Sequence, residues 1–285
     1  MRNSIRDGSG VTNVVSILMI IGIVVSLMGM VFATYLPAWG KDVEVQTKVE
    51  VMDNIIDLRS NLDTLSVGGD TGASLSAKIR LGSTGGPLFG FGRSSGSLDM
   101  DEESGLVTVV DQAGNTYGQG RGTVVYRSNH LYTEDQIISM EMGALIRNEG
   151  GVDILKGPPN IVIKRDENTD QTTIFISLFI LEGQDVSVSG TQSYMISSTL
   201  LSEEGSEYDI AAGTDITITI MTERVLLWTD TLRETAEEQG LVEGAGNDFE
   251  ISSGTDVLGN PFVSFVIHDL DIMKIRSSVF SLDVY

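Results

Sequence analysis

The stretch Val14–Leu36, VVSILMIIGIVVSLMGMVFATYL, contains no charged side chain over 23 residues. As an α-helix it would be about 34 Å long, which is enough to cross the hydrocarbon core of a bilayer. A helix of this length in the core of a soluble protein would show a polar face, and this stretch shows none. The sequence therefore predicts a single transmembrane helix that anchors the rest of the chain.

The residues that flank this span predict its orientation in the membrane. Arg2 and Arg6 precede it, and Lys41 follows it ahead of a strongly acidic remainder. Positive charge near a span stays on the cytoplasmic side, so we expect a cytoplasmic N-terminus and an extracellular C-terminal domain. Tyr35 and Trp39 stand where interfacial aromatic residues belong, which places the outer membrane interface near the end of the span.

A secretory signal peptide that is removed entirely is the alternative interpretation of the same stretch. The apolar run is longer than the core of a typical signal peptide, and no Ala-x-Ala site ends it. The tripeptide Pro37-Ala38-Trp39 is a poor substitute for such a site. We therefore favour a helix that stays on the mature protein.

Small residues inside the span predict a role beyond anchoring. Gly22, Ser26, Gly29 and Ala33 follow one another at spacings of four, three and four, which places them on one face of the helix. Such a face allows a second helix to approach closely. Small residues are also common in membrane helices without any such role, and we favour helix–helix association over that alternative.

A second helical pattern follows Pro37 and Gly40, where we expect a break or kink. Apolar residues recur there at spacings of three and four, with acidic residues such as Glu44 between them: Val45, Val49, Met52, Ile55, Ile56, Leu62 and Leu65. This pattern predicts an amphipathic helix of about six turns that ends before Gly68-Gly69. Its apolar stripe should pack on the outer domain or on neighbouring copies.

From Gly68 onward the sequence predicts short strands between turns. The expected strands are Ala77–Leu81, Leu106–Val110, Gly122–Arg127, Ile161–Lys164, Thr172–Leu181, the run around Val186 and Val188, Ile216–Ile220, Phe262–Ile267 and Val279–Val284. Thr172–Leu181 is nearly continuous apolar sequence, as in a strand buried on both faces. Ile216–Ile220 alternates isoleucine with threonine, as in a half-buried strand.

One helix interrupts the second half of this region. Thr229 or Asp230 is the expected N-cap, Gln239 the last residue and Gly240 the stop, with Trp228 and Leu232 docking the helix on a sheet. The expected fold is α+β. An N-terminal transmembrane and amphipathic helix precedes a mostly antiparallel, β-sandwich-like extracellular domain with one short helix.

Composition excludes several classes of function. With 40 acidic and 18 basic residues the net charge is -22, so the surface repels phosphate backbones and we expect no nucleic-acid partner. The chain has no cysteine, which excludes disulfides and thiolate metal sites. Only His130 and His268 could supply imidazole ligands, and neither has a second histidine at metal-binding spacing. We expect no cofactor and no metal.

Possible catalytic and cation-binding motifs are weak. The segment Gly92–Gly96 matches G-x-S-x-G with Ser94 as the nucleophile, and His268 follows in the right order, but the strand–turn–helix context and an oxyanion motif are absent. The acidic clusters Asp99–Glu103 and Asp269–Asp271 lack the spacing of an EF-hand, so a solvated acidic turn is favoured over a calcium site. We expect no catalytic residues, and an extracellular enzyme is the least favoured hypothesis.

The N-terminal organisation resembles a known family. A basic leader with Arg2 and Arg6, then Gly8-Ser9-Gly10 and Val11-Thr12-Asn13 before the apolar helix, resembles the class III signal of archaeal type IV pilin-like proteins. Looser similarity lies in the head, in Tyr126–Asn129 followed by Gly143–Ile146, in Pro158-Pro159, and in the Trp228-x-x-x-Leu232 helix that follows the Ile216–Ile220 strand.

The resemblance implies that a prepilin peptidase cuts after Gly8 or Gly10 and leaves the apolar helix on the mature protein. The fifth mature residue would then be Asn13 or Val15, where bacterial pilins have a glutamate. The implied organisation is a leader (1–10), a transmembrane helix (11–36), an amphipathic stalk (37–66) and an extracytoplasmic β-rich domain (67–285).

The expected function is that of a type IV pilin-like structural or adhesive subunit of a surface filament, anchored in the membrane before assembly. Its implied partners are the membrane, other copies or pilin-like subunits, and the prepilin peptidase. The head is larger than that of a typical major archaeal pilin, which favours a minor, tip or pilin-like surface subunit. The alternative is a single-pass surface protein that never polymerises and binds a ligand or partner through its head.

Overall fold

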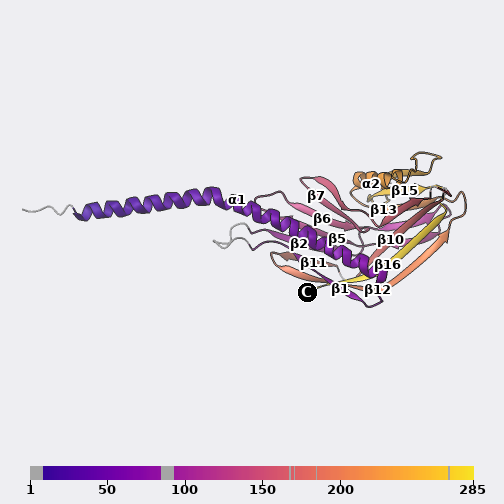
Figure 1. The fold of residues 1–285 in the computed structure, drawn as a ribbon, viewed down its shortest axis with the longest axis horizontal. Coiled ribbons are helices and arrows are strands. Elements are labelled where there is room, and N and C mark those ends of the chain that lie inside the picture. Colours follow the sequence, from indigo (N-terminus) through magenta and orange to yellow (C-terminus); the bar gives the residue numbers. More distant parts are fainter. Residues whose placement is uncertain (1–8, 85–92, 167, 170, 184, 269) are drawn as a thin grey trace, which may run out of the picture.

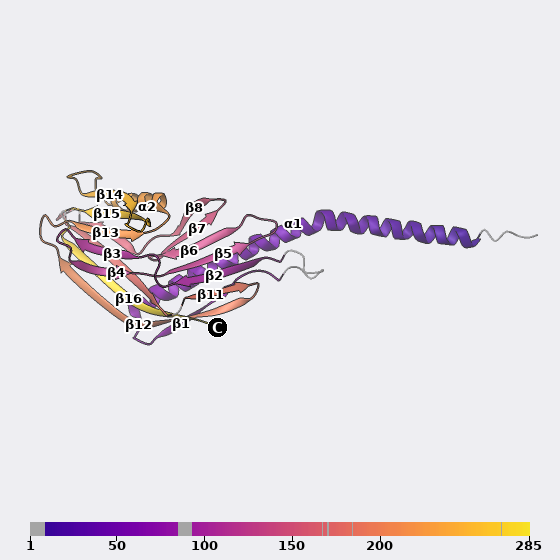
Figure 2. The ribbon, with the colours of Figure 1, turned by 180° about the vertical axis from the view of Figure 1, so that it is seen from behind.

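A computed structural model of the chain describes residues 9–84, 93–166, 168–169, 171–183, 185–268 and 270–285, with side chains from Val14 onward. One long helix projects from a β-rich head (Figure 1). The view from behind places the strands β3, β4, β13 and β15 at the end of the head that is farthest from the free part of the helix (Figure 2).

The helix α1 runs without interruption from Ser9 to Gly68 over 60 residues. Pro37 lies inside it, so the transmembrane and stalk segments expected on either side of a break or kink form one continuous helix. Its axis bends between the free part and the part that lies along the head (Figure 1). Proline lacks the N–H of the helical hydrogen bond and crowds the preceding turn, which is the usual cause of such a bend.

The described residues of the head form three sheets. Sheet 1 has the strand order β1 (Ser74–Arg80), β12 (Ser193–Asp209), β16 (Ile272–Val284), β10 (Thr172–Glu182) and β9 (Ile161–Arg165). Sheet 2 has the order β11 (Val186–Gly190), β2 (Ser95–Asp101), β5 (Thr123–Asn129), β6 (Gln136–Glu141), β7 (Ala144–Glu149) and β8 (Val152–Gly157). Sheet 3 has the order β14 (Phe249–Thr255), β15 (Pro261–Ile267), β13 (Ile216–Met221), β3 (Val107–Asp111) and β4 (Thr116–Gly120).

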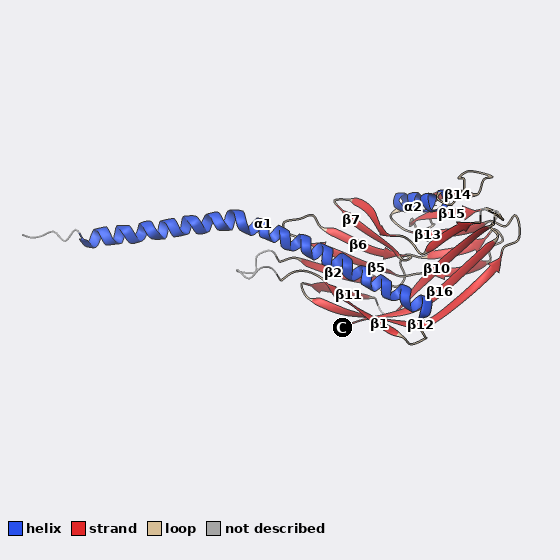
Figure 3. Cartoon of the chain, in the orientation of Figure 1, coloured by secondary structure: helices blue, strands red, loops and turns tan. Residues whose placement is uncertain are grey.

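These sheets confirm the expected fold class. The pair β10–β16 is parallel, and the other strand pairs of the described residues are antiparallel. One further helix, α2 (Val225–Glu237), packs on sheet 3 (Figure 3). The chain is therefore an α+β protein with a long N-terminal apolar helix and a β-rich head.

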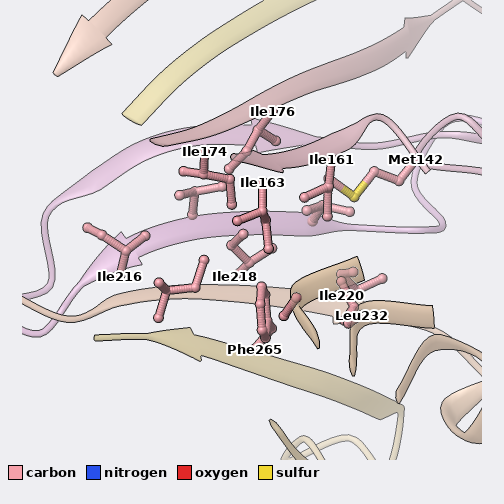
Figure 4. Close-up of a cluster of buried hydrophobic side chains, with 14 of the residues drawn as sticks. Met142, Ile161, Ile163, Ile174, Ile176, Ile216, Ile218, Ile220, Leu232 and Phe265 are labelled. Carbon is pink, nitrogen blue, oxygen red and sulfur yellow. The ribbon is translucent and has the colours of Figure 1, made fainter. Parts of the chain in front are cut away.

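Strand β10 separates two hydrophobic cores because its side chains alternate between the two faces of sheet 1. Ile174 and Ile176 belong to a core shared with sheet 3, where Ile218 of β13 is fully buried. Figure 4 shows these residues packed between the strands of the two sheets. Phe179 and Leu181 belong to a second core, under α1 and sheet 2. The prediction of a strand buried on both faces is confirmed only for the second half of β10, because Thr173, Phe175 and Ser177 are partly exposed.

The part of α1 beside the head has two apolar stripes rather than one. Side chains at spacings of four, three, four and three are buried in the second core: Val51, Ile55, Leu58, Leu62 and Leu65. Full burial of such a side chain contributes about 1.5–3 kcal/mol, so this stripe fixes the helix to the head. Val45, Val49 and Ile56, expected in the same stripe, face outward and are 45%, 58% and 42% exposed.

Helix α2 begins four residues before the expected Thr229 and ends at Glu237. The N-cap residue is Arg224, whose side chain makes no capping bond. A buried network fixes this start instead, because the Glu141 carboxylate accepts hydrogen bonds from the Thr222 hydroxyl at 2.9 Å and the Trp228 indole at 3.1 Å. Arg224 also pairs with Glu141. Trp228 and Leu232 are buried as expected.

Candidate functional site: the N-terminal helix and its junction with the head

The free part of α1 is apolar and is not covered by the rest of the protein. Among the described residues, one helix is long and apolar enough to cross a membrane, and none of its most apolar stretch is buried. Side chains along residues 14–35 are exposed, Phe32 among the least at 37%, and Leu36 is partly buried. Exposed apolar surface of this extent needs lipid or protein around it. Helix α1 is therefore a candidate membrane span.

The four predicted packing residues lie within this free part. A Cβ atom added to Gly22 or Gly29 would meet no atom within 4 Å, so the space beside both glycines is open. The Ser26 hydroxyl donates to the carbonyl oxygen of Gly22 at 2.8 Å, which satisfies it inside its own helix. Together with Ala33 these residues form a face of small side chains, which a second helix can approach closely.

The predicted membrane-interface residues fall into two groups. Tyr35 is 71% exposed, Trp39 is 37% exposed and Lys41 is also exposed, all close to where α1 meets the head. Arg2 and Arg6 lie outside the described residues.

The two candidate processing positions lie near the start of the helix. Gly8 is outside the described residues, and Gly10 is in the first turn of α1.

At the junction, the carboxylate of Glu44 holds the loop between β5 and β6. Glu44 is fully buried. Its oxygens accept hydrogen bonds from the backbone N–H groups of Leu131 at 2.7 Å, Tyr132 at 2.9 Å and Thr133 at 2.8 Å. The Thr133 hydroxyl donates a further bond at 3.0 Å. Charge-assisted bonds of this kind are about twice as strong as neutral ones, and a buried carboxylate without them would be costly.

The same loop packs against the helix backbone at Gly40. A Cβ atom at this position would lie within van der Waals overlap of the Tyr132 ring. Glycine therefore lets the ring lie directly on the helix. We call the set formed by Gly40, Glu44 and the loop residues Leu131–Thr133 the Glu44 clamp.

One turn further along, Lys48 and His130 continue the junction. The Lys48 ammonium lies 2.7 Å from Glu149 on β7, and its side chain is only 10% exposed. This hydrogen bond from Lys48 lowers the pKa of Glu149. Burial lowers the pKa of His130, partly opposed by the nearby Glu44 carboxylate. Both ring nitrogens of His130 are buried without a hydrogen-bond partner among the described residues.

The last turns of α1 are tied by polar contacts to the connection between β8 and β9 and to sheet 1. The Arg59 guanidinium donates to the carbonyl oxygen of Pro158 at 2.8 Å. The Asn160 amide donates to Asp63 at 3.3 Å, and the hydroxyls of Ser66 and Ser278 are 2.8 Å apart in a buried pair. The docked helix is thus fixed by polar contacts at its start, near its middle and at its end.

The weak catalytic motif is not brought together. Ser94 is fully buried, and its hydroxyl is 3.0 Å from that of Ser83. The His268 Nδ1 atom lies 2.8 Å from Asp215, and its Nε2 atom lies 3.7 Å from Glu250.

Carboxylates of the two acidic clusters form ion pairs and hydrogen bonds with other groups of the protein. Asp99 pairs with Arg127 on β5, and Asp101 accepts the backbone N–H groups of its own turn. Asp271 accepts the N–H of Thr172 at 2.7 Å. Asp269 lies outside the described residues. Within the described parts of the chain, no group of three or more acidic, histidine or cysteine side chains is arranged to hold a metal ion.

The sequence pattern does not predict the Glu44 clamp, because Glu44 falls among the polar residues between the apolar positions of the amphipathic helix. The spacing between Glu44 and the buried stripe could have indicated that Glu44 is buried. Glu44 stands seven residues before Val51, on the same face as the buried stripe. A lone carboxylate in line with a buried stripe needs hydrogen-bond donors from elsewhere in the fold.

Comparison with known proteins identifies the family of this chain. Residues 9–272 match the profile of one protein family, which is described as a family of unknown function (DUF7289). The chain belongs to this family. No curated protein and no solved structure matches it.

Proposed function

We propose that this member of the DUF7289 family is a type IV pilin-like subunit of a surface filament, of the kind found in archaea. Helix α1 holds the chain in the cell membrane before assembly, with the N-terminus in the cytoplasm and the head outside. After a prepilin peptidase removes the leader, α1 packs against the helices of other copies or of related subunits. The head then remains on the outside of the filament, where it serves as a structural or adhesive element.

The observation that supports this proposal best is the continuity of α1 between two environments. The free part is apolar on all sides, and the docked part buries only one face against the head. Val45, Val49 and Ile56 remain exposed on the docked part, beyond the reach of a bilayer that covers residues 14–36. A neighbouring helix would cover both this stripe and the small-residue face with one continuous contact.

The orientation rests on charge. Arg2 and Arg6 precede the span, and every acidic residue except Asp7 follows it. The positive-inside rule then favours a head outside the cytoplasm. A head with few basic residues also agrees with a surface that stays soluble at high local concentration along a filament.

Processing is tested first. Coexpression with a prepilin peptidase should lower the mass of the membrane-extracted protein by about 1 kDa, the mass of the residues up to Gly8 or Gly10. N-terminal sequencing of the product would identify the cut. An unshifted mass in the presence of an active peptidase contradicts the proposal.

Assembly is tested with substitutions on opposite faces of the free helix. Gly22→Leu with Gly29→Leu fills the small-residue face and should abolish filaments without loss of membrane insertion. Val24→Leu with Val31→Leu adds bulk to the opposite face and serves as the matched control. Filaments of normal yield from the first pair would favour the alternative, a surface protein that stays monomeric in the membrane.

The exposed stripe of Val45, Val49 and Ile56 allows a third test, by cysteine cross-linking. The chain has no cysteine of its own, so an introduced cysteine can react only with another introduced cysteine. Val49→Cys should form cross-links between copies in assembled material, whereas Val51→Cys, fully buried against the head, should not. Equal cross-linking at both positions would argue against an ordered helix contact.

A further inference from the structure

The head reaches the end of the apolar span of α1. Side chains of the span up to Tyr35 are exposed, whereas Leu36, its last residue, is partly buried. Gly40 and Glu44 follow Leu36 at spacings of four, so the three residues share one face of the helix. Gly40 and Glu44 are buried under the β5–β6 loop, through the Tyr132 ring and the loop backbone. The covered face of α1 therefore extends to the residue where the span ends.

Helix geometry gives the height of this loop above a bilayer. Gly40 lies about 6 Å beyond Leu36 along the axis, since each residue adds about 1.5 Å. The polar headgroup layer on each side of a hydrocarbon core is about 5–8 Å thick. Around an upright helix, a core that ends at Leu36 has its headgroup layer at the level of Gly40, where the Tyr132 ring packs. The side chain of Glu44 leans toward the N-terminus of the helix, which holds its loop partners close to that level.

The exposed side chains at this level suit a headgroup layer. Leu131 is 69% exposed although it belongs to a buried junction. Tyr35 and Trp39 are exposed on α1 beside it, and such aromatic residues prefer the membrane interface. Lys41 is exposed as well, and its flexible side chain can carry the ammonium group to a lipid phosphate. The helix and the loop therefore both present interfacial side chains at the same height.

We propose that the β5–β6 loop is a second membrane contact, in which Leu131 enters the headgroup layer of the leaflet that faces the head. The Glu44 clamp holds the loop at a fixed height on α1, so the loop reaches the lipid whenever the span is inserted. A single helix can tilt and rotate in a bilayer unless interfacial anchors oppose it. The loop contact therefore fixes the orientation of the head relative to the membrane. This inference rests on the membrane anchoring in the proposed function and not on the assembly of filaments.

Charge does not attract this loop to lipid. Glu134 and Asp135 follow the clamp residues and are exposed, and the chain has a net charge of -22. Anionic lipids would repel these carboxylates. The contact is therefore apolar and interfacial, and we expect it with zwitterionic phosphatidylcholine. A second copy of this chain is a less suitable cover for Leu131, because it would bring further acidic surface close to Glu134 and Asp135.

The test uses the full chain in phosphatidylcholine vesicles, with a fluorophore on a single introduced cysteine, since the chain has none of its own. A label at Leu131→Cys should lose much of its emission when the lipids carry a nitroxide in the headgroup. The matched control is Leu258→Cys, which is 83% exposed in the turn between β14 and β15 and should lose none. Strand β15 lies at the end of the head farthest from the free part of α1 (Figure 2).

A third label separates this inference from the proposed anchoring. Phe32→Cys lies in the span and should be quenched by a nitroxide on the acyl chain. No quenching at Phe32 contradicts the anchoring itself. Quenching at Phe32 together with a Leu131 label that behaves like the Leu258 label overturns the loop contact alone. A Leu131 label that is shielded from aqueous iodide but not reached by the headgroup nitroxide is covered by protein, and this result also overturns the proposal.

A substitution tests whether the contact orients the head. Leu131→Glu leaves the clamp in place, because Leu131 binds Glu44 through its backbone N–H. It should change the energy transfer from a label at Leu258→Cys to acceptor lipids, since the head is then free to tilt. Leu226→Glu, at a position of α2 that is 80% exposed, is the matched charge control and should leave the transfer unchanged. Equal transfer with and without Leu131→Glu overturns the orienting role of the loop.

Discussion

Tyr132 in the β5–β6 loop binds Glu44 of α1 through its backbone and contacts the helix a second time, at Gly40, through its ring. The backbone N–H of Tyr132 donates to both oxygens of the Glu44 carboxylate, at 3.2 Å and 2.9 Å, and the Tyr132 ring lies on the helix at Gly40, one turn earlier. The contact with Glu44 uses the backbone of Tyr132, and the contact with Gly40 uses its side chain. Together they fix both the rotation and the position of α1 at the point where it leaves the head.

Glu44→Gln should lower the free energy of unfolding of the head by roughly 2–3 kcal/mol, because a buried amide supplies fewer acceptors and turns donors toward the loop N–H groups. Chemical denaturation of the full chain in micelles, followed by circular dichroism, measures this loss. The control is Glu50→Gln, whose exposed ion pair with Arg80 at 2.8 Å should be worth only about 0–1 kcal/mol. Losses of equal size would contradict the role given to Glu44.

Gly40→Ala should destabilise the junction, although the same exchange inside an exposed helix stabilises by about 1 kcal/mol. The added methyl group would displace the Tyr132 ring. Hydrogen exchange of the loop N–H groups at Leu131–Thr133 should accelerate. Tyr132→Ala in the same chain should remove the penalty. Gly68→Ala, with open space around its Cβ position, is the control and should be neutral or stabilising.

Trp228→Phe should cost about 1–3 kcal/mol, because it removes a donor to the buried Glu141 carboxylate and leaves a small cavity beside α2. The chain has only one other tryptophan, Trp39, on the exposed part of α1. Trp39→Phe is therefore the matched control, with an expected change within about 0.5 kcal/mol. Thermal unfolding of both variants in the same micelles compares them directly, and an equal effect would count against the buried network.

Asp63→Asn should raise the melting temperature at pH 7. Burial raises the pKa of Asp63, against the opposing charge of Arg59 and a hydrogen bond from Asn160. Because the folded-state pKa lies above the unfolded value of 3.8, the contribution of Asp63 is fully present below that value and is lost as the pH rises through the folded-state pKa. The variant keeps an oxygen for Asn160 and removes the partly buried charge.

The advantage of Asp63→Asn should therefore shrink as the pH falls and should vanish below about pH 3.8, where the wild-type carboxyl is protonated. Melting temperatures from pH 3 to pH 7 test this course. Asp57→Asn, on the exposed side of α1, provides the comparison. A lower melting temperature of Asp63→Asn at pH 7 would show that the contact with Arg59 outweighs burial.

Elements that depend on local pattern were predictable from the sequence. Helix α1 follows from an unbroken apolar run, and β10 and β13 follow from the spacing of their apolar residues. The long strand β12 was not expected, because its second half is polar and acidic. Its strand conformation depends on pairing with β16, about seventy residues later in the chain.

The candidate functional site was predictable only in part, because some of its contacts join residues that are far apart in the sequence. The small-residue face of α1 is a property of helical spacing alone, and helix geometry places Gly22 and Gly29 together. The burial of Glu44 depends on donors from Leu131–Thr133, nearly ninety residues away. The start of α2 depends likewise on Glu141, far from Arg224 in sequence. Spacing within a segment gives no information about such distant partners.

The placement of α1 along the head has a mechanical consequence. The helix is bound at Glu44, at Arg59 and at Ser66, and these contacts follow one another along its axis. A pull on the free end of α1 acts along that axis, so the contacts and the buried stripe between them share the load in shear. Attachments loaded in shear resist together, whereas attachments that are peeled fail one after another. The head is thus fastened to its helix in the geometry that best withstands tension.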